Sequence, residues 1–248
     1  MNFSKDITLK YNDICFYFKY LDWDSNFFNK PSYLLDINKS NLGISNIIQK
    51  EIEKQFNNCF LTVKIDASFD YTIISFLQVS GFTYIDTEVI LEYGIYKNKL
   101  NSNKIQIIKE IKNNNLPYDE LGKSFSLTRF HTDLNIDNAK ADILWINYLK
   151  NYELSDNKHM FSAKVDSEFA GIILVNINED IATLFFVAVV EKFRGLGIGT
   201  ILIQNALEYF KDYVIRTETQ IKNINALNFY IGNGLNKIQK TLTVLHRW

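Results

Sequence analysis

Three glycines in the second half of the chain have the residue type and the spacing of a phosphate-binding loop. They lie in the run Arg194-Gly195-Leu196-Gly197-Ile198-Gly199, between a strand-like segment that ends at Val189 and a helix-like segment. Glycines let consecutive backbone N–H groups turn toward one point, and the N-terminus of the following helix adds a partial positive charge. The run therefore predicts a site for two linked phosphates.

The same glycines also fit two other structures. A dinucleotide-binding fold places such a loop after its first strand, with an acidic residue about 20 positions later. Here the loop comes late and follows a predicted hairpin, but Glu218 does stand roughly 20 positions after Gly199. A plain glycine-rich turn between a strand and a helix is the simplest alternative. The loop by itself leaves all three interpretations open.

The composition excludes several classes of protein. Hydrophobic residues make up 47% of the chain and charged residues 22%, and 27 Lys and Arg against 28 Asp and Glu give a net charge of −1. That balance offers no positive field to nucleic acid, and the longest apolar run, 184–190, is far shorter than the roughly 20 residues of a membrane helix. Two cysteines are too few for a disulfide framework or a zinc site. We therefore expect a cytoplasmic protein with no nucleic-acid partner, membrane insertion or metal.

The spacing of apolar residues predicts the helices and strands that must position the loop. The first half gives helices near 44–56 and 69–79 and strands near 59–65 and 83–93. The second half gives helices near 136–149, 197–210 and 223–230, and strands near 159–165, 169–177, 181–189, 214–220 and 236–248. The polar stretch 97–104 is typical of a linker. We expect a mixed α/β fold with an N-terminal domain over 1–103 and a catalytic domain over 104–248.

The two halves echo each other when Gly81 is aligned with Gly234. Each glycine follows a helical pattern and precedes a strand pattern. The strand residues that this alignment pairs are Leu61-Thr62-Val63 and Val214-Ile215-Arg216. The first half has Leu77 where the second has Tyr230, and it lacks a counterpart of the glycine-rich loop. We infer that the first half shares the architecture and lacks the chemistry.

The segment 189–234 as a whole resembles the GCN5-related N-acetyltransferase (GNAT) superfamily. Two blocks carry the resemblance: Val189-x-Glu-Lys-Phe-Arg-Gly-x-Gly-x-Gly199, and Asn223-x-x-Ala-x-x-x-Tyr230-x-x-x-Gly234. Segments 23–28, 125–130 and 245–248 extend the similarity toward the TDP-fucosamine acetyltransferases. The resemblance implies a mixed, mostly antiparallel sheet with splayed central strands, preceded by a smaller, degenerate α/β half-domain. It also implies acetyl-CoA as the co-substrate.

The resemblance further implies roles for single residues in acetyl transfer. The strand 181–189 would diverge from its neighbour at a bulge, so that its backbone amides face the thioester. Tyr230 is the expected general acid, because a phenol with a pKa of about 10 stays protonated at neutral pH and can give a proton to the leaving sulfur. A tyrosine of the core is the alternative interpretation. The expected cofactor-binding residues are Val187, Ala188, Val189, Arg194, Gly195, Leu196, Gly197, Ile198, Gly199, Thr200, Asn223 and Tyr230.

The sequence specifies the acceptor side less sharply. Glu218, His131 and a water molecule are alternative general bases. The planar guanidinium of Arg129 fits the oxygens of a phosphate, and a surface ion pair is its other interpretation. The aromatic residues in 23–28 fit either stacking on a nucleotide base or core packing. The candidate substrate-binding residues are Arg129, His131, Glu218 and Gln220.

Together these expectations describe an acetyl-CoA-dependent N-acetyltransferase. Its expected acceptor is the amine of a nucleotide-linked amino-deoxy sugar of the TDP-4-amino-4,6-dideoxyhexose type, in surface polysaccharide biosynthesis. The alternatives are another small amine or a protein amine as acceptor, and a non-catalytic acyl-CoA-binding module. The sequence leaves open the sugar configuration, the nucleotide, and whether the chain is a monomer or a homodimer.

Overall fold

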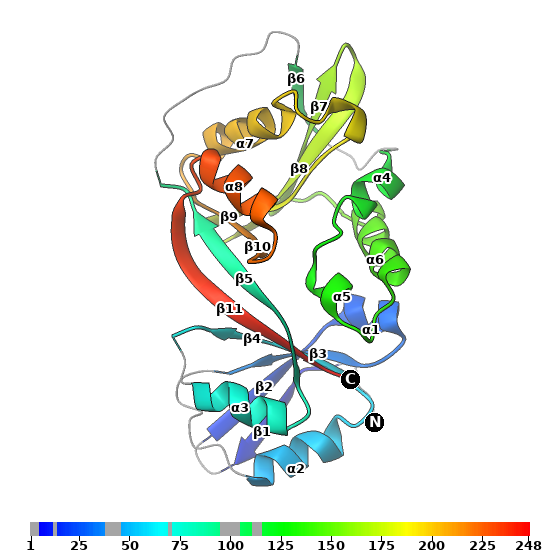
Figure 1. Ribbon diagram of the computed structural model, residues 1–248, viewed down its shortest axis with the longest axis vertical. Helices are drawn as coiled ribbons and strands as arrows, with labels where there is room; N and C mark the ends of the chain where they lie inside the picture. The colour runs from blue at the N-terminus through cyan, green and yellow to red at the C-terminus, as the bar shows by residue number, and fades with distance from the viewer. Residues whose placement is uncertain (1–4, 12–13, 38–45, 69–70, 95–104, 111–115) are drawn as a thin grey trace. The chain divides into compact units, whose positions relative to one another are not determined.

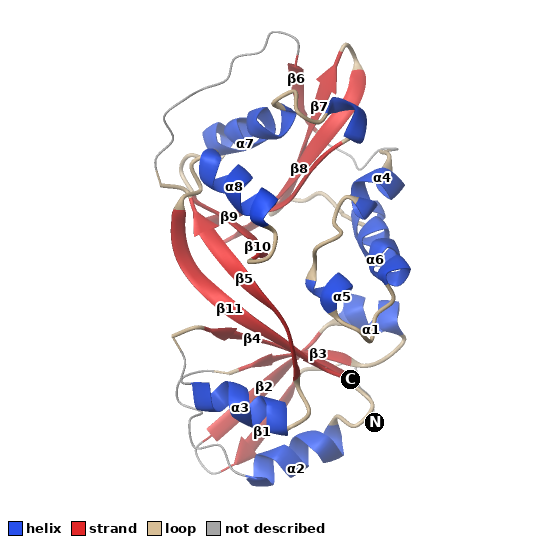
Figure 2. Cartoon of the chain, in the orientation of Figure 1, coloured by secondary structure: helices blue, strands red, loops and turns tan. Residues whose placement is uncertain are grey.

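The computed structural model describes residues 5–11, 14–37, 46–68, 71–94, 105–110 and 116–248 (Figures 1 and 2). The chain divides into two compact units. Unit 1 comprises Met1–Glu88, Thr132–Ile136 and Lys240–Trp248, and unit 2 comprises Val89–His131 and Asp137–Gln239. The expected linker 97–104 lies outside the described residues. This division departs from the expected boundary near 103, because the end of the chain belongs with unit 1 and residues from Val89 onward belong with unit 2.

Unit 1 is built on strands in the order β1-β2-β3-β4-β11. Neighbouring strands are antiparallel except β3 and β4, which are parallel. Its elements are β1 (Ile7–Tyr11), β2 (Ile14–Tyr20), α1 (Asp22–Phe28), β3 (Ser32–Asp36), α2 (Asn46–Gln55), β4 (Phe60–Asp66), α3 (Tyr71–Val79), the first part of β5 (Thr83–Glu92) and most of β11 (Lys237–Arg247).

Unit 2 has strands in the order β5-β10-β9-β8-β7-β6. The ladders β6–β7, β7–β8 and β8–β9 are antiparallel, and β9–β10 is parallel. Its further elements are β6 (Ile105–Lys109), α4 (Tyr118–Lys123), α5 (Arg129–Thr132), α6 (Asn138–Lys150), β7 (Lys158–Val165), β8 (Glu168–Asn178), β9 (Ile181–Val189), the 3₁₀ helix η2 (Glu191–Phe193), α7 (Ile198–Tyr209), β10 (Val214–Gln220) and α8 (Ile224–Gly232).

Helices cover both faces of the unit 2 sheet (Figure 2). Helices α7 and α8 bury apolar residues on one face, and α4 and α6 do so on the other. Burying an aliphatic side chain stabilises a fold by about 1.5–3 kcal/mol, so these two layers fix the sheet between them. The first layer includes Leu184, Leu202, Ile203, Ile215, Leu227 and Tyr230, and the second includes Leu121, Leu149, Ile172, Leu174, Phe186 and Ala188.

Unit 1 has a core of its own and, on the other face of its sheet, a buried polar cluster. The core packs α2 and α3 against β2, β3, β4 and β11. In the polar cluster the carboxylate of Asp133 accepts hydrogen bonds from His246 Nδ1 at 2.6 Å and from Trp248 Nε1 at 2.8 Å. Burial by itself raises the pKa of Asp133, but the bonds from His246, the Asn135 N–H and Trp248 outweigh burial and lower that pKa to about 2. Sequence analysis did not predict this cluster, because Asp133 lies more than 100 positions from His246 and Trp248 along the chain.

Most helices and strands that the sequence predicts are present. Helices α2, α3, α6, α7 and α8 and strands β4, β5 and β7 to β11 lie within about three residues of the expected ranges. The apolar pattern missed α1, β1, β2 and β3, as well as β6, α4 and α5. These missed elements are ten residues or shorter, and periodicity is a weak signal over such lengths.

The internal echo corresponds to a shared architecture. The series β1-β2-β3-α2-β4-α3-β5 and β7-β8-β9-α7-β10-α8-β11 have the same order of elements, apart from α1 between β2 and β3 and η2 between β9 and α7. The ladders in each series run in the same directions. Gly81 and Gly234 end the matching helices with φ values of 85° and 90°. The predicted alignment of Leu61 with Val214 is wrong by one residue. Leu61 and Ile215 are both buried, whereas Val214 is exposed, so Leu61 corresponds to Ile215. A shift of one residue moves every side chain of a strand to the opposite face.

Candidate acetyl-CoA site

The turn from η2 into α7 requires glycine at two positions. Gly195 has a φ of 79°, and Gly197, the N-cap of α7, has a φ of 78°. Other residues strain the backbone by about 1–2 kcal/mol at such values. The turn leaves the first N–H groups of α7 without partners inside the helix, at the end where the helix dipole is positive. This end of α7 has the features of an anion site.

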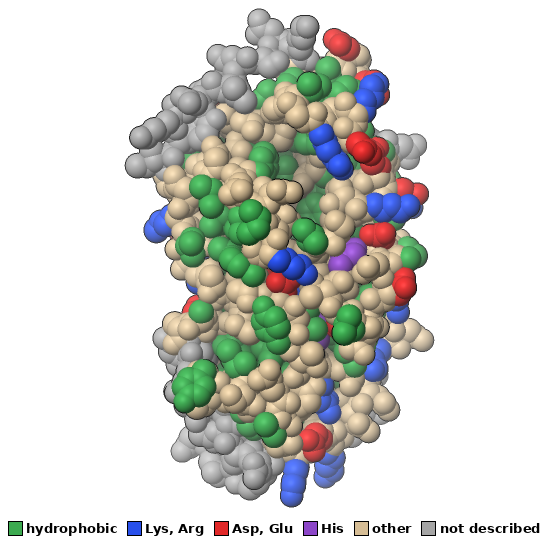
Figure 3. Space-filling model, in the orientation of Figure 1, with side chains coloured by type: hydrophobic (Ala, Val, Ile, Leu, Met, Phe, Trp, Pro, Cys, Tyr) green, Lys and Arg blue, Asp and Glu red, His purple; other side chains and the backbone are tan. Residues whose placement is uncertain are grey.

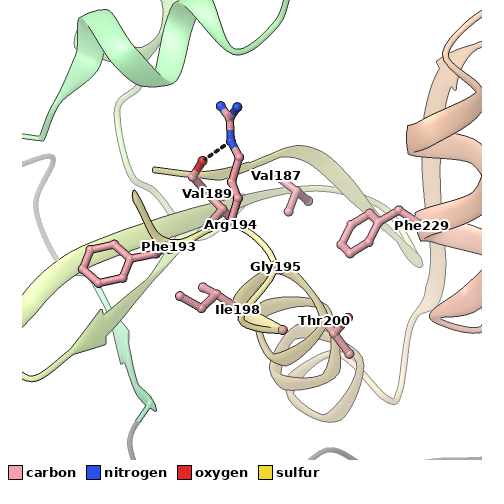
Figure 4. Close-up of a pocket in the computed structure, with 10 residues that line it drawn as sticks. Val187, Val189, Phe193, Arg194, Gly195, Ile198, Thr200 and Phe229 are labelled. Carbon is pink, nitrogen blue, oxygen red and sulfur yellow. Dashed lines mark hydrogen bonds between the residues drawn. The ribbon is translucent and has the colours of Figure 1, made fainter. Parts of the chain in front are cut away.

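A pocket of about 320 Å³ opens beside this turn. Figure 4 shows Val187 of β9 and Phe229 of α8 facing one another across it, with the start of α7 below. The surface of unit 2 is hollowed in the space-filling view, with hydrophobic side chains visible inside the recess (Figure 3). The residues that line the pocket are Val187, Val189, Phe193, Arg194, Gly195, Gly197, Ile198, Gly199, Thr200 and Phe229.

The third glycine is required by packing. A Cβ atom on Gly199 would lie 2.9 Å and 3.2 Å from two ring carbons of Phe229. Carbon atoms attract one another best at about 3.5–4.0 Å, so a side chain there would displace the ring. The hydrogen on Gly199 therefore lets Phe229 form one wall of the pocket.

Strand β9 is irregular beside the pocket. In its ladder with β8, Phe186 pairs with Leu174 and Leu184 pairs with Val175, so Phe185 is an extra, bulged residue. The parallel ladder between β9 and β10 ends where Leu184 pairs with Thr217. Beyond this pair β9 and β10 are no longer paired. The sequence analysis expected such a separation of the central strands.

The alternation of β9 determines which amides face the open side. The Val190 N–H donates to the Ala170 carbonyl of β8 at 2.9 Å. By alternation, the Ala188 N–H also points toward β8, and the N–H groups of Val187 and Val189 point away from it. The Val189 carbonyl points away too, because it accepts from Arg194 Nε at 3.2 Å (Figure 4). The expectation that Ala188 presents its amide to a ligand does not fit this alternation.

Tyr230 lies where β9 and β10 separate. Its hydroxyl is hydrogen-bonded to Thr217, whose own Oγ1 donates to the Leu184 carbonyl at 2.9 Å. The tyrosine hydroxyl is therefore the donor toward Thr217. Burial raises the pKa of Tyr230. The phenol thus keeps its proton at neutral pH, as a general acid must.

Three expected cofactor-binding residues have other surroundings in the structure. Asn223 is the N-cap of α8, where its side-chain oxygen accepts from the Ala226 N–H at 3.2 Å. Leu196 is 60% exposed and does not line the pocket, because the loop turns its side chain outward. Tyr230 lies behind Phe229 in the core rather than in the pocket wall.

The candidate acceptor residues come from two elements. Arg129 and His131 lie on α5, and the Arg129 guanidinium carbon lies 4.3 Å from the centre of the Phe130 ring. Both nitrogens of His131 have partners within unit 2, namely Thr128 and Asp142. Glu218 and Gln220 are half-buried on β10 and share the strand face opposite Thr217. Both residues follow Thr217, the last residue of β10 that pairs with β9.

Sequence reasoning missed three residues of this site. Phe193 and Phe229 line the pocket, and Thr217 binds the hydroxyl of Tyr230. Phe229 directly precedes Tyr230, and Thr217 falls on the buried alternation of β10, so weak signals existed for both. Nothing in the run Glu191-Lys192-Phe193 distinguishes Phe193 from a core residue.

The part of the chain that the structure describes lacks two kinds of feature. No group of three or more His, Cys, Asp or Glu in that part could hold a metal ion. No helix in it is long and apolar enough to cross a membrane.

Comparison with known families assigns the class. Residues 123–234 match the Acetyltransferase (GNAT) family, and the matched segment contains the pocket loop, the splayed strands and Tyr230. This segment is therefore similar to acetyltransferases of the GNAT family, which use acetyl-CoA as co-substrate. The mixed, mostly antiparallel sheet of unit 2 is the GNAT fold that the sequence predicted.

One curated protein and two solved structures illustrate what this chain is similar to. An N-alpha-acetyltransferase from Sulfurisphaera tokodaii is 28% identical over an alignment of 111 positions, which covers 38% of this chain and 64% of the relative's length. A functionally unknown conserved protein from Staphylococcus epidermidis has a TM-score of 0.62 at 12% identity, over 98% of this chain and 94% of that one. A GCN5-related N-acetyltransferase from Sphaerobacter thermophilus has a TM-score of 0.62 at 11% identity, over 94% and 76%. The two structural likenesses show the fold across nearly the whole chain.

Proposed function

We propose that this chain transfers the acetyl group of acetyl-CoA to an amine. One observation carries the proposal: the pocket joins an anion site at the start of α7 to the separated part of β9, with Tyr230 behind it. The amides from Arg194 to Thr200 would hold the pyrophosphate. The amides of Val187 and Val189, which point away from β8, would bind the pantetheine arm and the thioester carbonyl. The side-chain NH₂ group of Asn223 can donate a further hydrogen bond to the pantetheine arm.

Each chemical step has a candidate group. The amine forms a C–N bond with the thioester carbonyl, and a backbone amide of β9 stabilises the negative charge that develops on the carbonyl oxygen. Tyr230 then gives its proton to the departing sulfur. Its raised pKa keeps the phenol protonated at neutral pH, so the proton is present when the C–S bond breaks.

The proton that the amine loses goes to Glu218, directly or through a water molecule. Glu218 follows Thr217, the last residue paired with β9, and occupies the opposite face of the strand from Tyr230. The amine can therefore approach the carbonyl from the side away from the leaving sulfur. His131 is less suited, because Thr128 and Asp142 already engage its two nitrogens.

For the acceptor we propose a nucleotide-linked amino-deoxy sugar of the TDP-4-amino-4,6-dideoxyhexose type, acetylated during surface polysaccharide biosynthesis. The sequence similarity to the TDP-fucosamine acetyltransferases supports this choice. Arg129 offers a guanidinium for the phosphates of such a substrate, and Gln220 shares the strand face of Glu218.

A second acceptor has support from a relative. The Sulfurisphaera tokodaii protein is named an N-alpha-acetyltransferase. The N-terminal amine of a protein is therefore the main competing acceptor, with the same pocket and the same acid.

Calorimetry and product analysis test the proposal in two stages. Titration with acetyl-CoA should show binding, and the absence of any binding heat together with an empty pocket in a crystal soaked with acetyl-CoA would refute it. Thiol release and mass spectrometry should then be followed with three acceptors: TDP-4-amino-4,6-dideoxygalactose, glucosamine, and a peptide with a free N-terminus. We expect fastest turnover with the first. Faster turnover of the peptide would establish the competing acceptor, and binding without any transfer would indicate a non-catalytic acyl-CoA-binding module.

A further inference from the structure

A hydrogen-bonded network in unit 2 connects α5 with α6. Thr128 Oγ1 lies 2.8 Å from His131 Nδ1, and His131 Nε2 lies 3.1 Å from Asp142 Oδ1. Trp145 Nε1 lies 3.3 Å from the same Thr128 oxygen. The His131 side chain is 6% exposed, and Thr128 is buried. These groups are therefore held in one arrangement by their partners.

The direction of each bond follows from the chemistry of the partners. The indole N–H of Trp145 can only donate, so the Thr128 oxygen accepts from it. The Asp142 carboxylate accepts from His131 Nε2–H. In the neutral imidazole the other nitrogen is then an acceptor, and it receives the Thr128 hydroxyl proton. The network thus runs from Asp142 through His131 and Thr128 to Trp145.

Trp145 extends the network to β9. Its ring centre lies 6.2 Å from that of Phe185, the bulged residue, and 6.3 Å from that of Phe186. Phe125 packs between α6 and the strand, 5.1 Å from Trp145 and stacked on Phe186 at 4.1 Å. Val187, which lines the pocket, is the next residue of the strand. The aromatic contacts therefore end beside the amides that the proposed reaction uses.

We propose that His131 is a positioning residue for acetyl transfer: through Thr128 it fixes Trp145, and through Trp145 it fixes the bulge of β9. This inference rests on the proposed function. Sequence analysis named His131 as a candidate base or substrate-binding residue, and the proposed role requires no contact between His131 and the acceptor. A displacement of about 1 Å at a reacting group can cost about 100-fold in rate, so a loosened bulge should lower turnover.

The first experiment needs neither cofactor nor acceptor. The chain has three tryptophans, and Trp145→Phe identifies the indole N–H signal of Trp145 in a ¹H–¹⁵N spectrum. His131→Gln retains a donor for Asp142 and loses the acceptor for Thr128, whereas His131→Asn retains that acceptor. We expect the Trp145 signal to move in His131→Gln and in Thr128→Val, and to stay closer to wild type in His131→Asn and Thr128→Ser.

The second experiment measures acetyl transfer from acetyl-CoA to TDP-4-amino-4,6-dideoxygalactose, or to the faster of the other two test acceptors. His131→Gln should lower kcat roughly 10- to 100-fold, with the Kd for acetyl-CoA within about twofold of wild type, and His131→Asn should recover part of the loss. His159→Ala is the matched control: this histidine of β7 bonds the Asp156 carbonyl, lies outside the network and should leave both readouts unchanged.

The outcomes separate this inference from the proposed function. An unmoved indole signal in His131→Gln refutes the network, and an unchanged kcat in that variant refutes the positioning role. A lower kcat with an unmoved indole signal shows instead that His131 acts directly on the acceptor. Wild-type protein that binds no acetyl-CoA refutes the proposed function, while the indole measurement still decides whether His131 fixes Trp145. Far-ultraviolet circular dichroism confirms that each variant is folded before it is compared.

Discussion

The two halves of the chain share one architecture, and they differ at the place where the second half carries its candidate site. In the second half, Tyr230 of α8 bonds Thr217 of β10 where the strands separate. The matching positions of the first half are Leu77 of α3 and Val63 of β4, both fully buried in the core. A hydroxyl pair is thus replaced by an apolar contact.

This difference shows what the architecture requires and what the chemistry adds. A strand, a helix, a glycine with positive φ and a second strand fold in both halves, with Gly81 and Gly234 in equivalent conformations. A fold of this kind positions a site without specifying its chemistry. Unit 1 has its own polar cluster, but Asp133 and His246 are fully buried there and serve packing rather than a pocket.

Replacing Tyr230 by Phe should have the largest effect, because it removes the proposed acid, a hydroxyl that the first half also lacks at Leu77. We expect kcat to fall by about 100- to 10,000-fold, the range of a lost general acid, with little change in acetyl-CoA affinity. Thiol release and calorimetry measure the two quantities. Tyr33→Phe is the control in unit 1, since burial raises the pKa of Tyr33 to about 12 and no step uses it. Equal losses in both variants would contradict the assignment.

Asp133→Asn tests the polar cluster that belongs to unit 1. Breaking a buried ion pair costs about 3–5 kcal/mol, so we expect the free energy of unfolding in urea at pH 7 to fall by about 3 kcal/mol. Asp142→Asn in unit 2 is the comparison, and it should cost under about 1 kcal/mol because Asp142 is partly exposed.

The same carboxyl predicts a pH dependence with a definite sign. The folded-state pKa of Asp133 is about 2, below its ordinary 3.8. The folded state therefore favours the carboxylate, so the stabilisation is complete above about pH 4 and is lost as pH falls toward 2. The loss amounts to about 2 kcal/mol. Wild type should lose this stability on acidification, and Asp133→Asn should lose less of it; identical pH profiles would argue against the low pKa.

Gly199→Ala distinguishes a glycine needed for the pocket from one needed for the fold. Its Cβ would press on the Phe229 ring, and we expect acetyl-CoA to bind about tenfold more weakly. Gly81→Ala is the counterpart in unit 1. Because Gly81 has a φ of 85°, that change should lower stability by about 1–2 kcal/mol and leave acetyl-CoA binding unchanged. Calorimetry and urea unfolding separate the two effects, and weaker binding in Gly81→Ala alone would reverse the assignment.

Asn223 gives the smallest expected effect and sharpens one proposed contact. Asn223→Ala removes the cap of α8 and should cost about 1 kcal/mol of stability. Asn223→Asp keeps an oxygen for the Ala226 N–H and removes the amide donor. If that donor binds the pantetheine arm, both variants should weaken acetyl-CoA binding several-fold; a loss in the Ala variant alone would show that Asn223 acts only as a cap.

The pocket loop was predictable because its causes are local. Gly195 and Gly197 need positive φ, and a helix start provides free N–H groups whatever surrounds it. Tyr230 followed from its spacing in a known motif. Phe229 did not follow, because only the packing of α8 on Gly199 makes its ring a wall. His131 was recognised as a candidate, but its partners Thr128 and Asp142 could not be chosen from the sequence.

The sequence by itself determined most of the elements that carry the pocket and the conformation of its glycines, since short-range sterics and periodic burial act along the chain. The tertiary structure alone decided where the ends of β5 and β11 belong, where β9 bulges and separates from β10, and which amides face the opening. Backbone hydrogen bonds pair strands with little regard to side-chain identity, so register and partner emerge only when the whole sheet has packed.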